Sequence, residues 1–111
     1  MVPSVIVTTS PSVPGFRIVR IAGLVSGLTA RTRGVGGKFI AGLQSLAGGE
    51  VTAFTSEMLK ARDEALQRAI DQARYLGANA IISVDFETSE IFEAVVLVSV
   101  TGIAVLVKSE K

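Results

Sequence analysis

The feature that most constrains the fold is an uncharged, mostly apolar stretch at residues 94–107. Apolar side chains occupy both its odd and its even positions, and successive side chains of a β-strand point to opposite faces of the sheet. Both faces of such a strand must therefore be buried. The stretch is shorter than the ~20 residues of a membrane-spanning helix, and it contains Ser99, Thr101 and Gly102. We predict one long strand from about residue 92, or a hairpin broken near Thr101 and Gly102, and not a membrane anchor.

Two helices are predicted in the middle of the chain. The stronger one begins at about Thr52 or Thr55 and ends near Leu76, with its apolar residues forming one stripe. Gly77 stands where a left-handed residue commonly ends a helix, and the chain then resumes a strand pattern. A shorter helix is predicted at residues 39–46, where apolar residues recur at helical spacing before two glycines.

Further strands are predicted on either side of these helices. Residues 5–9 are a β-branched run that ends in a turn rich in proline and glycine. Residues 16–24 alternate imperfectly between apolar and polar, which indicates an antiparallel or edge strand with a bulge near Ala22 or Gly23. Residues 80–86 resume a strand pattern after the long helix.

The element order indicates the fold class. Polar residues 88–90 are expected to interrupt the strand pattern and so to separate the last two strand segments. The resulting order, β-β-α-α-β-β, predicts an α+β fold in which a small mixed sheet packs on one long and one short helix. A chain of 111 residues is sufficient for one core, so residues 1–111 form a single domain.

The apolar surface of this sheet exceeds what its helices can cover. The long helix can bury one face, and the short helix is too small to bury the other. A second subunit would bury the surplus, so we expect a homo-oligomer. The alternative is that the short helix and the adjoining loop cover that face within one chain.

The composition excludes several kinds of chemistry. Histidine and cysteine are both absent, which removes the commonest general base, thiolate nucleophiles and zinc sites of the thiolate type. We therefore expect a non-enzymatic protein without a cofactor. Eleven Lys and Arg balance ten Asp and Glu, so no large positive field is available for nucleic acid or an acidic membrane.

The first residues give an expectation for location. Residues 1–10 contain no cationic segment ahead of an apolar run, and Pro11 and Pro14 follow closely. A secretory signal needs a cationic segment followed by an apolar run. We expect a cytoplasmic protein.

Residues 31–38 are a candidate anion-binding loop. Glycines let backbone N–H groups approach an anion, and the N-terminus of a predicted helix follows. Thr32 and Phe39 occupy positions where a P-loop requires glycine and Ser or Thr, so the loop is not a P-loop. A solvated connection is the alternative to a small-anion or phosphometabolite site. The candidate residues are Arg31, Arg33, Gly36, Gly37 and Lys38.

Four carboxylates near a strand end are a candidate metal site. Carboxylate oxygens suit hard cations such as calcium or magnesium, but the spacing is not that of an EF-hand. If two of the four share a strand face, the others need not join them, and a solvated acidic edge is the alternative. The candidate residues are Asp85, Glu87, Glu90 and Glu93.

The polar residues of the long helix are interpreted as a solvated face. Their charges are mixed in sign, and Glu64 and Arg68 stand at the stabilising i, i+4 spacing. Tyr75, the single tyrosine, is expected to pack beneath the loop that follows the helix.

The chain resembles the YbjQ family over nearly its whole length. The resemblance rests on several short segments taken together, which are Thr8-Thr9 with Pro14-Gly15, Gly23-Leu24-Val25-Ser26-Gly27, Gly48-Gly49-Glu50, Ala61-Arg62 with Glu64-Ala65, and Leu76-Gly77-Ala78-Asn79-Ala80-Ile81-Ile82 followed by Phe86 and Thr88-Ser89. It implies a bacterial protein with an α+β fold assembled into a ring, typically a homopentamer, and no known enzyme activity.

The family carries a heavy-metal-binding label, but this chain departs from what such a label suggests. Met1 and Met58 are its only soft ligands, so a thiolate site for a soft metal is impossible. The segment from Val100 to Ala104 also differs from the aromatic-Gly-Thr-Ala pattern usual in the family. We expect a ring-forming scaffold or binding module, with a carboxylate metal site or an anion site at residues 31–38 as alternatives.

Overall fold

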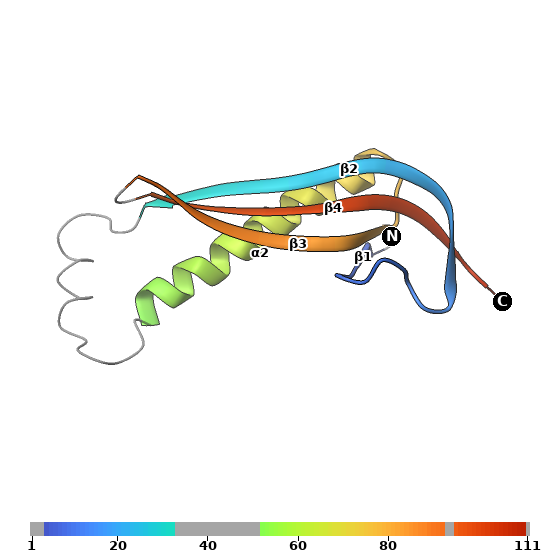
Figure 1. The fold of residues 1–111 in the computed structure, drawn as a ribbon, viewed down its shortest axis with the longest axis horizontal. Helices are drawn as coiled ribbons and strands as arrows, with labels where there is room; N and C mark the ends of the chain where they lie inside the picture. The colour runs from blue at the N-terminus through green and yellow to red at the C-terminus, as the bar shows by residue number, and fades with distance from the viewer. Residues whose placement is uncertain (1–3, 33–51, 93–94, 111) are drawn as a thin grey trace.

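The computed structural model of the protein describes residues 4–32, 52–92 and 95–110. In these residues one mixed sheet of four strands packs against one helix that runs behind it in Figure 1. The strands are β1 (Ile6–Val7), β2 (Phe16–Thr32), β3 (Ala80–Phe92) and β4 (Val95–Ser109), and the helix is α2 (Thr52–Tyr75). The predicted α+β class is confirmed. The predicted helix at residues 39–46 lies outside the described residues.

Strand β4 lies at the centre of the sheet. The strand order is β1-β3-β4-β2, with β1 parallel to β3 and β4 antiparallel to both of its neighbours. Of the two alternatives for this segment, the structure shows one long strand and no hairpin, because β4 continues through Thr101 and Gly102. Gly102 instead permits close packing, since a Cβ atom there would lie 2.5 Å from Cγ2 of Ile81.

Strand β2 forms one edge of the sheet, as the imperfect alternation predicted. The expected bulge is confirmed, because the pairing with β4 shifts between Ile21 and Gly23. A second shift lies between Ile18 and Arg20. The strand extends beyond the predicted residue 24 because alternate residues of its second half pack beneath α2.

Strand β3 is also longer than predicted. Thr88, Ser89 and Glu90 do not interrupt it, because they pair with Val98, Leu97 and Val96 of β4. The three polar side chains are exposed, so the strand accommodates them without burying polar groups. Pairing with the central strand thus outweighs local composition here.

Helix α2 packs very closely on the sheet. Four alanines at four-residue spacing are buried against it, namely Ala61, Ala65, Ala69 and Ala73. A Cβ atom on Gly27 would lie 1.7 Å from the carbonyl oxygen of Ala65, so this close contact between β2 and the helix requires glycine at position 27.

The predicted end of the helix is confirmed in detail. Gly77 has a φ of 78°, which glycine adopts at low cost. The N–H of Gly77 donates to the carbonyl of Arg74 at 3.0 Å, and the N–H of Ala78 donates to that of Ala73 at 2.9 Å. These two bonds form a Schellman motif, which turns the chain directly into β3.

The sheet face opposite α2 is covered at one end by the N-terminal segment. Val13 is buried there against Ala80, Ile82, Val105 and Val107. The rest of this face carries no described segment over it, and we call it the open face. By strand pairing and alternation, its residues are Ile21, Leu24, Ser26, Leu28 and Ala30 of β2, Val95, Leu97, Ser99 and Thr101 of β4, and Asp85, Glu87 and Ser89 of β3.

The close helix contact predicts a large cost for a small side chain. Gly27→Ala should lower the free energy of unfolding by about 1 to 3 kcal/mol, because the helix must shift to admit the methyl group. Urea unfolding at one fixed subunit concentration measures the change. Ser26→Ala is the matched control, because Ser26 is exposed on the open face, and it should stay within about 0.5 kcal/mol of the parent. Equal stability of the two variants would contradict the close contact.

Candidate functional site

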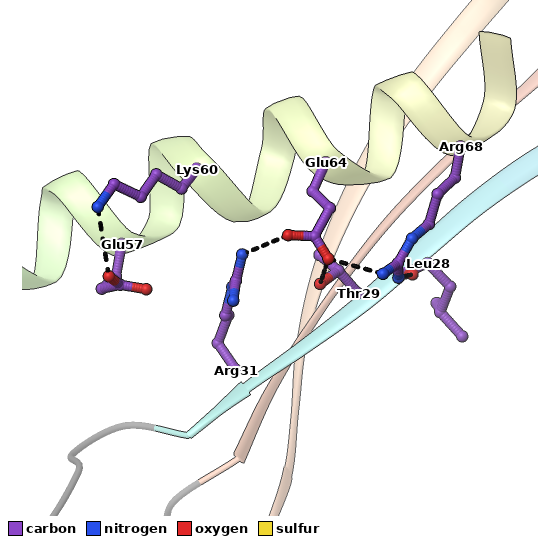
Figure 2. Close-up of polar contacts among 7 residues, drawn as sticks. All are labelled: Leu28, Thr29, Arg31, Glu57, Lys60, Glu64 and Arg68. Carbon is purple, nitrogen blue, oxygen red and sulfur yellow. Dashed lines mark hydrogen bonds and ion pairs between the residues drawn. The ribbon is translucent and has the colours of Figure 1, made fainter. Parts of the chain in front are cut away.

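Arg31, the first residue of the predicted anion loop, lies in strand β2 and not in a loop. Its Nη2 contacts Oε2 of Glu64 at 2.6 Å, as Figure 2 shows. The strand continues beyond residue 30, where the loop was expected to begin, because Arg31 faces α2 and forms an ion pair with Glu64. Arg33, Gly36, Gly37 and Lys38 lie outside the described residues. Anion binding by this segment therefore stays a prediction.

Glu64 connects the helix to the edge strand. Its carboxylate accepts hydrogen bonds from Thr29 Oγ1 at 3.3 Å and from Arg68 Nη2 at 2.7 Å, in addition to the Arg31 contact. Arg68 also donates to the carbonyl oxygen of Leu28 (Figure 2). The predicted i, i+4 pair is confirmed. The side chains of Arg68 and Glu64 are 53% and 39% exposed, as a solvated face requires, and both also bind β2.

The candidate metal ligands are divided between the two faces of the sheet. Asp85 and Glu87 pair with Thr101 and Ser99 and lie on the open face. Glu90 pairs with Val96 and lies on the opposite face, and Glu93 is outside the described residues. Among the described residues, no group of three or more acidic side chains is placed to hold a metal ion.

Tyr75 is 90% exposed, so the prediction that it packs beneath the following loop is wrong. The helix places it about 200° around the axis from Ala73, which faces the sheet. The side chain therefore points outward. It lines an open groove of about 430 Å³, which we call the α2 groove, formed by Arg68, Asp71, Gln72, Tyr75 and Leu76.

Three exposed apolar side chains of β2 form a second surface that sequence reasoning did not single out. Ile21, Leu24 and Leu28 are 69%, 75% and 52% exposed and lie on the open face. We call these three residues the β2 row. Their uneven spacing follows from the bulge at Ala22, which conceals the period-2 pattern in the sequence.

The β2 row and the α2 groove border the same edge strand. Oε1 of Gln72 accepts the backbone N–H of Ser26 at 3.0 Å. Arg20 reaches over from β2 to donate to the carbonyl oxygen of Leu76 at 3.2 Å. Side chains of the helix therefore hydrogen-bond to backbone groups along the edge of β2. Apolar surface lies on both sides of this edge.

Comparison with known proteins places the chain in a family of uncharacterised proteins. The model of the YbjQ family, described as "Putative heavy-metal-binding", matches residues 5–108. A UPF0145 protein of Picrophilus torridus is 46% identical over 102 residues, covering 92% of this chain and 86% of that protein. A UPF0145 protein of Saccharolobus solfataricus is 45% identical over 104 residues, covering 94% and 91%. The resemblance noted from the sequence is confirmed.

A solved structure has the same fold. It is the crystal structure of a protein of unknown function in the DUF74 family from Pediococcus pentosaceus, with a TM-score of 0.64 and 18% identity, covering 94% of this chain and 98% of that one. None of the three proteins described here has a name that states an enzyme activity. The two UPF0145 relatives are archaeal, so the bacterial source remains a prediction.

No helix in the described part of the chain is both long and apolar enough to cross a bilayer. The cytoplasmic location inferred from the first residues stays a prediction.

The Glu64 contacts predict a measurable difference between two glutamates of the same helix. Glu64→Ala should lower the free energy of unfolding by about 1 to 2 kcal/mol, since it leaves Arg31 and Arg68 without their carboxylate partner. Glu57→Ala removes one exposed pair with Lys60 at 3.8 Å and should cost at most about 0.5 kcal/mol. Urea unfolding of both variants compares them. Equal effects would show that Glu64 does not connect helix and strand.

Proposed function

The chain belongs to the YbjQ family, and from this premise we propose that it is a non-enzymatic protein that assembles into a ring-shaped homo-oligomer. The resemblance implies a pentamer as the ring size. In this proposal the ring acts as a scaffold or binding module, and the surfaces between subunits are its main functional surfaces.

The observation that supports assembly is the exposure of the β2 row. Single exposed apolar residues are common on monomers, but Ile21, Leu24 and Leu28 follow one another along one face of one strand. They adjoin Leu97 of β4 on the same face, which is partly buried. Covering this surface would remove apolar area from water and so favour association.

The composition supports a non-enzymatic role. Without histidine and cysteine, the chain lacks the side chains that most often act as general base or as thiolate nucleophile at neutral pH. Arg31, Glu64 and Arg68 form contacts between α2 and β2, where they stabilise the fold.

Two binding functions are alternatives, and each has one supporting observation. A carboxylate metal site is supported by Asp85 and Glu87, which share the open face of β3, and by the family description. An anion site at residues 31–38 is supported by Nε of Arg31, which is buried and has no hydrogen-bond partner among the described residues.

The leading proposal predicts a discrete oligomer. Native mass spectrometry of the purified protein should give a pentamer, or a multiple of it, at the mass of the polypeptide alone. A monomer at micromolar concentration would contradict the proposal. A reproducible added mass would favour one of the alternatives.

Calorimetry separates the leading proposal from both alternatives. We expect no saturable heat with calcium, magnesium, manganese, zinc or copper, or with inorganic phosphate. Cation binding that the double variant Asp85→Asn, Glu87→Gln abolishes would establish the metal alternative. Phosphate binding that is lost when Arg31, Arg33 and Lys38 are replaced together would establish the anion alternative.

A further inference from the structure

Two apolar surfaces of this chain lie on opposite sides of one edge strand. The β2 row occupies the open face, and the α2 groove lies on the helix side. Leu76 lies between them. Cδ1 of Leu76 would be 4.0 Å from a Cβ atom on Gly23, and the carbonyl oxygen of Leu76 accepts a hydrogen bond from Arg20. The two surfaces differ in form, since one is a row of protruding side chains and the other is a groove.

The form of the two surfaces indicates what covers them. One chain carries both a row of protruding apolar side chains and a groove with apolar lining, so a second copy of this chain offers a partner for each surface. A standard contact covers about 800 Å² on each partner. A ring gives each subunit two such contacts, one through its row and one through its groove.

The mode of contact follows from the state of the strand edge. Arg68 binds the carbonyl of Leu28, and Gln72 binds the N–H of Ser26, so two outward backbone groups of β2 already have partners. A neighbouring strand could not pair with this part of the edge without displacing both helix side chains. The contact must therefore be made by side chains.

We infer that the β2 row of one subunit packs into the α2 groove of a second copy, with Leu24 against the ring of Tyr75 at the centre. The inference rests on the proposed ring assembly and names its interface. Because the row and the groove are different surfaces, the contact is head-to-tail, and each subunit still offers one free row and one free groove. Repetition of the contact closes a ring when the rotation between subunits allows it.

Variants on each surface test the interface against a matched control. Leu24→Ser and Tyr75→Ala should each raise the concentration at which the oligomer dissociates by at least tenfold, measured by sedimentation velocity over a dilution series. Leu59→Ser is the control, because Leu59 is 55% exposed on α2 but belongs to neither surface, and it should change that concentration less than twofold. Circular dichroism confirms that each variant is folded, and Leu28→Ser replaces Leu24→Ser if the latter is not.

Mixing the two variants tests the pairing of row with groove. The Tyr75→Ala subunit keeps an intact row, and the Leu24→Ser subunit keeps an intact groove, so an equimolar mixture should form 1:1 dimers that neither variant forms alone. A mixture without such dimers would overturn the pairing. A parent oligomer that neither substitution weakens would overturn the interface but leave the proposed ring intact. A monomeric parent protein would overturn both.

Discussion

The architecture depends on burying both faces of β4. Its residues Val96, Val98 and Val100 are buried beneath α2, whereas Val105 and Val107 are buried beneath the N-terminal segment. The one described helix covers one face of the sheet, and the N-terminal segment covers only one end of the second face. The uncovered part of the second face includes the edge strand β2, where apolar side chains remain in contact with water. The proposed assembly follows from this exposed apolar surface.

The contact between α2 and β2 determines which surfaces remain available. Gly27 and the small residues of the helix allow a very close approach, and Glu64 and Arg68 bind side chains and backbone of the strand. This contact holds the helix over the edge, so its polar side chains satisfy groups that an added strand would otherwise use. The same arrangement leaves Tyr75 pointing into solvent beside the edge. Strand β2 therefore contributes both to the stability of the fold and to the proposed contact between subunits.

Much of this fold was predictable, and the errors have physical causes. The bounds of α2, the left-handed Gly77 and the bulge near Ala22 depend on local geometry that residue types reveal. The continuity of β3 and β4 depends on pairing between strands, which overrides the turn-like composition of residues 88–90. The Arg31–Glu64 contact joins residues far apart in sequence, and no local pattern indicates it. Alternation separates Glu90 from Asp85 and Glu87, so the sequence cluster is not a cluster in space.

The most direct test of the account is whether β2 is covered in the intact protein. Hydroxyl-radical footprinting can compare two leucines of equal chemistry, because Leu24 is 75% exposed and Leu59 is 55% exposed in the single chain. The account predicts that Leu24 is oxidised more slowly than Leu59 at concentrations where the protein is assembled, and that dilution reverses the order. Faster oxidation of Leu24 at every concentration would show that the row is free, and would contradict the central claim.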